Sequence, residues 1–500
     1  MSPHDTERSE RSPYNPRVAV IGGGISGLSA AAYLVDLLPD VTIDVYEASS
    51  QPGGVLRSES IDGFLIEQAA DNFATQEDRV ADLHRILGLD VPLIRPNKSY
   101  RLARVFYGGK LHAIPQGFSL LQPTRLSSVF ASSLFSPAGK LRIAAERFVP
   151  ARRSDTDESL ESFATRRLGR EAFERLIEPV VCGIFTARAD RLSMRAALPQ
   201  FVRMEQEHGS LILAARVSRK RAKNAAVEPA TRSAADAARM ASGARYDIFQ
   251  APQAGMSDWV RQIVDSLPPR VRLLCNRQVE TLSRLPSNRW QVAPRSGTAA
   301  EYDGCVVAAN APQAAVLLQK VAPEVAAELA AIDYAGSAVA AIELDVADIA
   351  EVDRCFGIVS PTASGSPLLA ISFSSLKYFG RAPDGKILLR VFLGGAVHPE
   401  VEGWSDSEVA SFAASTVADT LKLAAKPRCL AIYRWAAAMP QYELGHLDRL
   451  SRIDHELATL PTLRLCGNFG RGVGIPQCIA SGRTAAESLA ASISREEQKS

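Results

Sequence analysis

The chain has 500 residues, of which 46% are hydrophobic and 22% are charged, and its formal net charge is only +2. This length exceeds one ordinary hydrophobic core, so we expect two or three domains. The near-neutral charge argues against a nucleic-acid-binding protein. The seven cysteines are scattered without a CxxC pair, which favours reduced thiols and predicts neither disulfides nor a metal site.

Residues 1–15 are polar and lack the apolar stretch that a secretory signal needs, so we expect a disordered lead-in there. Apolar runs long enough to span a bilayer, about 18 residues or more, occur nowhere in the sequence. We therefore expect a cytoplasmic protein whose membrane contact, if it has any, is peripheral.

Residues 18–34 read VAVIGGGISGLSAAAYL, an apolar run followed by glycines in GxGxxG spacing and then by small residues. This order predicts a strand, a tight turn and a helix N-terminus, which together bind a dinucleotide pyrophosphate on backbone N–H groups. The residues predicted to contact the dinucleotide are Gly22, Gly23, Gly24, Ile25, Ser26 and Gly27.

Glu47 ends the next predicted strand, VTIDVYEA, and lies 20 residues after Gly27. An acidic side chain at this spacing binds the ribose hydroxyls of a dinucleotide. We therefore assign Glu47 and its neighbour Ala48 to the cofactor site, with a solvated carboxylate as the alternative.

The segment QPGGVLRSE follows and contains Gly53, Gly54, Val55 and Arg57. It resembles the GGxxR(S/T) signature of FAD enzymes, and a guanidinium suits the two charges of a pyrophosphate. The resemblance implies FAD as the cofactor, with Gly54, Val55 and Arg57 among its contacts. An ordinary surface arginine is the alternative for Arg57.

Strand-rich, Gly-punctuated sequence recurs in residues 16–90, 246–312 and 430–495, which we interpret as a discontinuous, Rossmann-like FAD-binding domain of the α/β class. Residues 91–114 and 313–429 contain patterns such as AVAAIELDV and KILLRVFLGG. These patterns predict the mixed sheet of a substrate-binding domain.

Residues 115–215 are interpreted as a helical insertion, because apolar residues recur there near helical spacing. These residues are Phe163, Leu168, Phe173, Leu176 and Ile177. The following stretch, 216–245, is rich in arginine, lysine and alanine, which predicts a mobile basic insertion to which we assign no function.

The first part of the helical insertion, 118–149, combines apolar residues with Lys140, Arg142 and Arg147. Such a combination suits peripheral docking on a bilayer, and packing of a helical lid is the alternative. The apolar residues in question are Phe118, Leu120, Leu121, Val129, Phe130, Leu134 and Phe135.

Several further blocks resemble one family, the oxygen-dependent porphyrinogen oxidases of haem biosynthesis, which are FAD enzymes of the amine-oxidase superfamily. The likeness runs from about residue 16 to residue 490. The blocks that carry it are LFSPAGKLRIA, RRLGREAFERLIEPVVCGIF, LSMRA, GARYDIFQAPQAGMSDWV, FSSLKYFGRAPDGKILLRVFLGG, WAAAMPQYELGHLDRL and LCGNFGRGVGIPQCIASGRTAAE.

The resemblance implies further contacts to the flavin. In the family the last block runs along the flavin ring, and Trp435 and Val279 would contact the ring system and the adenine. The family's ExGP segment is replaced here by Glu67-Gln68-Ala69-Ala70, whose backbone contacts can survive. The implied cofactor contacts are Ala69, Ala70, Asp71, Asn72, Val279, Trp435, Gly467, Asn468, Val473, Gly474 and Ile475.

The resemblance also implies contacts to a porphyrinogen substrate. Gly183 would allow the backbone to approach a pyrrole, and Tyr378 would form an aromatic wall. The family's substrate-binding arginine aligns nearest Ala103, so Arg104 is assigned to the propionates with Arg101 as the alternative. A slip of one residue along a strand would turn the side chain to the other face.

The activity implied is the removal of six hydrogens from a porphyrinogen in three two-electron steps, with O₂ as the final acceptor and H₂O₂ as product. The cofactor supplies the difficult chemistry, so we expect no dedicated catalytic side chain. The residues do not separate protoporphyrinogen IX from coproporphyrinogen III as the substrate.

Two other functions stay open. The first is a flavin amine oxidase or carotenoid-type desaturase on the same scaffold, for which Phe469 and Trp435 are the aromatic candidates. The second is a flavin-binding protein without turnover. It is motivated by the altered residues 69–70 and by Thr186-Ala187-Arg188-Ala189, which replace the family's usual small and acidic residues.

Overall fold

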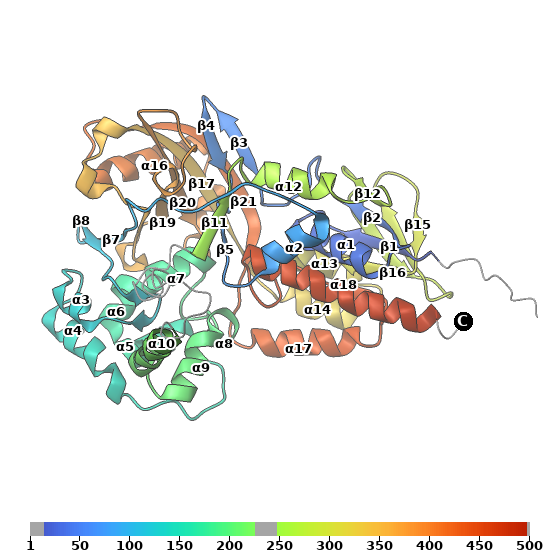
Figure 1. Cartoon of the computed structure of the whole chain (residues 1–500), viewed down its shortest axis with the longest axis horizontal. Helices are drawn as coiled ribbons and strands as arrows, with labels where there is room; N and C mark the ends of the chain where they lie inside the picture. The colour runs from blue at the N-terminus through green and yellow to red at the C-terminus, as the bar shows by residue number, and fades with distance from the viewer. Residues whose placement is uncertain (1–14, 226–247, 498–500) are drawn as a thin grey trace, which may run out of the picture.

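The computed structural model describes residues 15–225 and 248–497. It is an elongated molecule with a parallel sheet at one end and a larger mixed sheet beside a cluster of helices at the other (Figure 1).

The sheet at the first end has five strands in the order β12-β2-β1-β16-β22, and all of its pairings are parallel. Its three inner strands, β2, β1 and β16, run mostly through buried residues, as expected of a parallel sheet with both faces covered. The five strands are β1 (Arg17–Ile21), β2 (Thr42–Tyr46), β12 (Val271–Leu274), β16 (Gly304–Val307) and β22 (Leu463–Leu465).

Alternate residues of β1 pack into two different cores: Val18 and Val20 on one face, Ala19 and Ile21 on the other. The first face is covered by α1 (Ile25–Leu37), α2 (Arg79–Leu87), α12 (Met256–Asp265) and α18 (Ile475–Glu497). The second is covered by α13 (Ala311–Leu318), α14 (Pro323–Ala330), α17 (His446–Leu457) and the antiparallel sheet of β13 (Val279–Arg284), β14 (Trp290–Pro294) and β15 (Ala300–Tyr302).

The larger sheet has seven strands in the order β21-β17-β20-β19-β18-β7-β8 and is antiparallel except between β18 and β7. Its strands are β7 (Ala103–Tyr107), β8 (Lys110–Ala113), β17 (Tyr334–Asp345), β18 (Gly357–Val359), β19 (Leu368–Phe373), β20 (Lys386–Gly394) and β21 (Arg428–Pro440). The apolar face of α16 (Asp406–Leu421) covers one side. The hairpin of β3 (Ser58–Ile61) and β4 (Phe64–Glu67) packs on the other side.

Short elements connect these layers. The three-stranded sheet β5-β11-β6 joins β5 (Phe73–Ala74), β11 (Phe249–Pro252) and β6 (Leu93–Ile94), while β9 (Phe118–Ser119) pairs with β10 (Gln122–Pro123). The remaining short helices are α15 (Ser374–Lys377), η4 (Val346–Asp348), η5 (Glu351–Asp353), η6 (Thr362–Ser364) and η7 (Pro399–Gly403).

The helical cluster lies below the larger sheet in Figure 1, and the helical spacing predicted for this part is confirmed, because Phe163, Leu168, Phe173, Leu176 and Ile177 are all buried in one core. Its elements are α3 (Leu126–Ala131), α4 (Pro137–Ala144), η1 (Ala145–Phe148), α5 (Leu160–Leu168), α6 (Arg170–Ala172), the π-helical η2 (Phe173–Ile177), α7 (Glu178–Phe185), α8 (Met194–Ala197), α9 (Pro199–His208) and α10 (Leu211–Ala225). Within the described residues, every helix is too short or too polar to cross a membrane.

Two of the expected boundaries differ from the structure. Residues 430–440, expected in the FAD-binding domain, belong to β21, which pairs with β17 in the larger sheet. The basic stretch 216–245 begins as the continuation of α10, which ends at Ala225. The rest of that stretch, 226–245, and most of the lead-in, 1–14, lie outside the described residues.

The apolar surface expected in residues 118–149 is also different. Five of its seven apolar side chains are buried in the helical core, namely Phe118, Leu121, Val129, Leu134 and Phe135. Leu120 packs against that core, and only Phe130 is exposed, at 46%. Tertiary packing decides which apolar residues face inward. For most of these seven residues the structure agrees better with the alternative, packing within the helical part of the chain.

Helices α1 and α18 pack closely at Gly482. A Cβ atom at this position would lie 2.3 Å from the Ser26 carbonyl oxygen and 3.0 Å from the Ala30 nitrogen. Glycine is therefore the residue that lets these two backbones meet.

We expect Gly482→Ala to lower the free energy of unfolding by about 2 kcal/mol, because the added methyl group overlaps backbone atoms that cannot rotate away. Urea unfolding followed by circular dichroism measures the loss. Gly403→Ala is the matched control, since the described residues leave open space at its Cβ position. Equal free energies of unfolding for the two variants would contradict the close contact between α1 and α18 at Gly482.

Candidate functional site

The loops that follow four strands of the parallel sheet meet at the carboxyl edge of that sheet. Gly22 follows β1 and would bring a Cβ within 2.7 Å of the Ala308 oxygen, directly after β16. Glu47 follows β2, and Cys466, after β22, donates its backbone N–H to Val307. Ligands of open α/β sheets bind in the crevice at this edge.

The GxGxxG turn is tightly packed, and its geometry requires glycine at two positions. Gly22 has φ +116°, a conformation that favours glycine. A Cβ on Gly27 would lie 1.9 Å from the Gly22 oxygen, so helix and turn can approach only through glycine. Gly24 and Gly54 face each other, since a Cβ on Gly54 would lie 3.6 Å from the Gly24 Cα atom.

The N-terminus of α1 is free to bind an anion. Gly24 is its N-cap, and within the described residues no side chain accepts a hydrogen bond from the first turn, which also lacks acidic residues. Ile25 and Ser26 begin the helix and are buried. Uncapped N–H groups together with the helix dipole form an anion site, so the predicted contacts from Gly22 to Gly27 fit a pyrophosphate.

Glu47 is held in one orientation by three hydrogen bonds. Its Oε2 accepts from the Gly23 N–H at 2.9 Å, and its Oε1 accepts from the N–H and the hydroxyl of Ser49, each at 2.8 Å. A carboxylate accepts about four hydrogen bonds, which leaves one position for a ribose hydroxyl. The Glu47 carbonyl also accepts from the Arg277 N–H at 2.8 Å, which brings Val279, at the start of β13, toward the same end of the site.

Arg57 lies beside Glu47 and Ser49. Its Nη2 donates to the Ser49 hydroxyl at 3.2 Å, while its buried Nε has no hydrogen-bond partner in the part of the chain that the structure describes. A buried, unsatisfied guanidinium N–H calls for an acceptor, and a phosphate oxygen fits that need. The neighbouring predicted contacts Ala48 and Val55 are exposed.

Residues 67–70 are fixed by side chains of the larger sheet. Arg390 on β20 donates through Nη1 to the carbonyls of Glu67 and Ala69, at 2.9 and 2.6 Å. Trp435 on β21 donates its indole N–H to the Gln68 carbonyl at 2.9 Å. The adjacent Ala70 packs against the core that contains Ile25 and Ile475, so this segment bridges the two sheets.

Asp71 is buried and charged. Its Oδ2 lies 2.6 Å from Arg390 Nη2 and 3.0 Å from Lys377 Nζ. Burial opposes the charged form, but the two cations outweigh it and lower the pKa of Asp71 to about 2. Asn72 donates its side-chain amide to Asp71.

The loop from Gly467 to Gly474 connects β22 to α18. Gly467 donates its N–H to the Ser481 hydroxyl at 3.1 Å, and Asn468 donates its amide to the Ala438 carbonyl at 3.0 Å. Val473 and Gly474 are half-buried, and Ile475 begins α18 in the core shared with α1. The structure thus brings this loop and the GxGxxG turn to one edge of one sheet.

The three residues predicted to contact a substrate lie along the larger sheet. Gly183 is inside α7, where a Cβ would lie 3.9 Å from the Leu369 oxygen at the start of β19. Tyr378 follows α15, beyond the other end of β19, and is buried. Burial raises the pKa of its hydroxyl.

The register of β7 places Arg104 on the face of the larger sheet that α16 covers. On β7, Arg104 pairs with Ile358 of β18, which is buried in the core under α16, and its guanidinium donates to the Val352 carbonyl. Its neighbour Ala103 lies in a row of paired residues that crosses the sheet. In this row Ala103 pairs with Gly357, Gly357 with Ser372, and Ser372 with Arg390. Side chains alternate along a strand, so Arg104 faces away from the side that carries residues 67–72.

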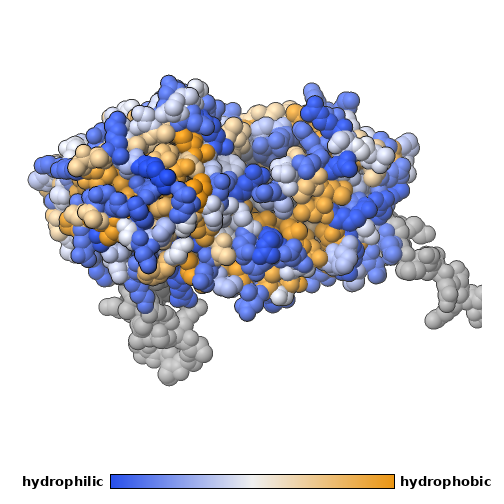
Figure 2. All heavy atoms as spheres, turned by 90° about the horizontal axis from the view of Figure 1, so that it is seen from above, coloured by the Kyte–Doolittle hydropathy of each residue, from blue (hydrophilic) through white to orange (hydrophobic). Residues whose placement is uncertain are grey.

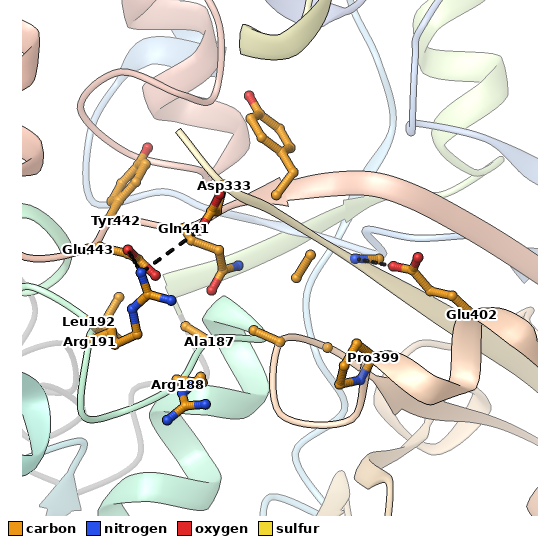
Figure 3. Close-up of a pocket in the computed structure, with 15 residues that line it drawn as sticks. Ala187, Arg188, Arg191, Leu192, Asp333, Pro399, Glu402, Gln441, Tyr442 and Glu443 are labelled. Carbon is orange, nitrogen blue, oxygen red and sulfur yellow. Dashed lines mark hydrogen bonds and ion pairs between the residues drawn. The ribbon is translucent and has the colours of Figure 1, made fainter. Parts of the chain in front are cut away.

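A cavity of about 310 Å³ lies beside the Gly-rich loop, where β17, β21 and the helical cluster meet. Figure 3 shows Arg191 reaching toward Glu443 and Asp333 at its wall, with Gln441 and Tyr442 alongside. The cavity lining also includes Tyr334, Gly336 and Glu402.

Sequence reasoning missed Arg390 and Tyr442. Arg390 is the arginine inside the apolar strand KILLRVFLGG, and a charged residue in such a strand indicates a buried, paired charge. Tyr442 stood in a block that carried the family resemblance, but its partner Asn468 is 26 residues away, and spacing gives no indication of that contact.

Comparisons with known proteins agree with this geometry. Residues 25–490 match the family described as flavin containing amine oxidoreductase. The chain is 28% identical over 473 residues to the coproporphyrinogen III oxidase of Bacillus subtilis (strain 168), covering 94% of this chain and 96% of that protein. It is 30% identical over 491 residues to the enzyme of the same name from Propionibacterium freudenreichii, covering 94% and 90%.

Among solved structures, one from Exiguobacterium sp. 255-15, provisionally named a protoporphyrinogen oxidase, superposes with a TM-score of 0.81 at 26% identity. The match covers 96% of this chain and all of that one. The family match runs from the start of α1 into α18 and includes the whole larger sheet and the helical cluster, and the chain therefore belongs to the flavin-containing amine oxidoreductases.

Proposed function

We propose that this protein is an FAD-dependent oxidase that converts coproporphyrinogen III to coproporphyrin III in haem biosynthesis, with O₂ as electron acceptor and H₂O₂ as product. The observation that carries the proposal is the extent of the match. Relatives named coproporphyrinogen III oxidase align with 94% of the chain, which includes the larger sheet and the helices as well as the dinucleotide edge.

The residues of the carboxyl edge fit FAD, which when bound would accept the two electrons of each oxidation. The N-terminus of α1 and Arg57 would hold the pyrophosphate, and Glu47 the ribose. Residues 69–72, Trp435 and the loop 467–475 would border the ring, because they surround the junction of the two sheets.

The substrate would lie along the β19 side of the larger sheet, between α7 and α15. The chain's part in the reaction is then to hold the macrocycle, to exclude water and to fix its distance from the cofactor. Asp71 is committed to Arg390 and Lys377, so it acts as an anchor for the backbone rather than as a proton acceptor.

We propose a division into domains that follows the two sheets. The FAD-binding domain would comprise the strands β1, β2, β12, β16 and β22 with their helices, and the substrate-binding domain the seven-stranded sheet. The helical cluster would form a third unit. Strand membership supports this division.

We also propose that the protein works in the cytoplasm and docks on anionic membranes through α4 and η1. Leu141 and Phe148 are exposed, at 64% and 73%, and lie seven residues apart with exposed Ala145 between them, which places them on one helical face. The exposed Arg147 lies over the Phe148 ring at 4.4 Å. Figure 2 shows how hydrophobic and hydrophilic residues alternate over one face of the molecule.

Anaerobic mixing of the FAD-loaded protein with coproporphyrinogen III is expected to bleach the flavin absorbance. Admission of O₂ is then expected to restore that absorbance and, over three two-electron turnovers, to produce porphyrin fluorescence. Protoporphyrinogen IX, which has two propionates fewer, is expected to react with lower kcat/KM. Bleaching by putrescine or another amine, with none by either porphyrinogen, would favour an amine oxidase instead. FAD bound without bleaching by any of these would favour the non-catalytic alternative.

Arg104→Ala is expected to leave KM for coproporphyrinogen III within about twofold, because its guanidinium lies on the far face of the sheet. Arg101, the alternative, lies two residues before β7 begins, and its guanidinium donates to the carbonyls of Asn97 and Pro96, at 3.2 and 3.3 Å. Loss of a charge-assisted hydrogen bond to a propionate would raise KM about tenfold in Arg101→Ala. Steady-state kinetics of the two variants decide between them, and a larger effect of Arg104→Ala would contradict the register described above.

Flotation with vesicles containing phosphatidylglycerol tests the docking surface. The wild type is expected to float at low salt and less at 1 M salt, because the attraction of Arg147 and Lys140 is screened. The double variant Leu141→Ser, Phe148→Ser is expected to stay at the bottom. Val316→Ser, which removes an equally exposed apolar side chain from α13, is the control, and equal flotation of all three proteins would overturn the proposal.

A further inference from the structure

The Gly-rich loop from Gly467 to Gly474 is held in place from the side of the cavity. Its four glycines, at 467, 470, 472 and 474, give it more backbone freedom than other residues would. Gly472 has φ +134°, and Gln477 would collide with any Cβ there, at 2.5 Å. A loop of this composition keeps one shape only where other parts of the chain fix it.

Tyr442 provides two of the hydrogen bonds that fix the loop. Its hydroxyl donates to the Asn468 carbonyl and accepts from the Gly472 N–H at 3.0 Å. The side chain is 1% exposed. One phenol oxygen therefore joins two backbone groups of the loop that are four residues apart.

His446 and Tyr334 make further contacts that fix the loop. The His446 ring stacks on the Tyr442 ring with centroids 4.3 Å apart, and its Nε2 lies 3.1 Å from the Gly470 carbonyl. The Tyr334 hydroxyl donates to Asn468 Oδ1 at 3.3 Å. The loop is thus contacted at 468, 470 and 472 by three rings, two of which, Tyr334 and Tyr442, line the cavity.

Tyr442 is itself anchored to the helical cluster. Its carbonyl accepts from the Ser193 N–H at 2.8 Å, and the Leu444 N–H donates to the Arg191 carbonyl at 3.0 Å. Arg191 also forms an ion pair with Glu443 at the cavity wall (Figure 3). The residue that shapes the loop is therefore tied to the part of the chain that carries α7.

We propose that Tyr442 is a positioning residue for the flavin: it holds the loop 467–474 and the N-terminus of α18 in the shape that stabilises the reduced cofactor. This inference rests on the proposed function. The N-terminus of α18 carries a partial positive charge, which favours an anionic, reduced flavin ring. Without the Tyr442 hydroxyl, the Gly472 N–H and the Asn468 carbonyl lose their hydrogen-bond partner. The backbone N–H groups of the loop then hold a less fixed orientation toward the flavin.

Tyr442→Phe removes the hydroxyl and keeps the ring that stacks on His446. We expect the Kd for FAD to rise about three- to tenfold, as for the loss of hydrogen bonds to neutral partners. The midpoint potential of the bound flavin should become more negative, and its visible spectrum should lose vibrational structure. The kcat should fall while KM for the porphyrinogen stays within about twofold, because the substrate side of the sheet is unchanged.

Tyr433→Phe is the matched control. Tyr433 is on β21, which ends two residues before Tyr442, is buried and donates its hydroxyl to Glu59 at 2.9 Å, away from the loop. Tyr334→Phe serves as the second test variant, with a smaller expected change in Kd and potential. Thermal unfolding of the apoproteins, which contain no flavin, shows whether Tyr442→Phe folds. If it does not fold, Tyr334→Phe decides the question.

FAD affinity and potential equal to those of the Tyr433→Phe control would overturn the proposal, even in a protein that oxidises porphyrinogens. A wild-type protein that binds FAD but oxidises no porphyrinogen would overturn the proposed function, and the potentials would still decide the role of Tyr442. Failure of the wild type to bind FAD would overturn both.

Discussion

One constraint shapes the carboxyl edge of the parallel sheet: two loops that lie far apart in the chain must approach each other there. In a parallel sheet the carboxyl ends of all strands lie at one edge, so the turns after β1 and β22 meet although more than 440 residues separate them. Glycine makes both approaches possible, at Gly27 between turn and helix and at Gly482 between α1 and α18. The helix dipoles then add positive potential at the same place.

Features that depend on local spacing could be predicted from the sequence. The strand, turn and helix around Gly22, Gly24 and Gly27 need only adjacent residues, and Glu47 ends the next parallel strand, one crossover away. The helical spacing of Phe163 to Ile177 likewise indicates its own buried face. The resemblance supplied the flavin family, because its blocks are distributed along almost the whole chain.

Features that depend on register or on distant partners could not be predicted in this way. The face on which Arg104 lies could not be predicted, because a shift of one residue reverses a strand side chain and only the pairing with Ile358 shows its direction. The apolar residues of 118–149 have the same composition whether they face lipid or core. Arg390 lies about 320 residues from the carbonyls it holds and Tyr442 lies 26 from Asn468, so neither contact leaves a spacing pattern.

The charged cluster at Asp71 shows how the larger sheet can control a site built by the smaller one. Arg390 holds the carbonyls of Glu67 and Ala69 and pairs with Asp71. The pKa of Asp71 in the folded protein, about 2, lies below the ordinary aspartate value of 3.8. The cluster therefore stabilises the fold fully at a pH above 3.8, and this contribution is lost as the pH falls through about 2. Asp71 therefore stays charged at neutral pH, and β20 keeps residues 67–71 in position while the cofactor, rather than a side chain, supplies the redox chemistry.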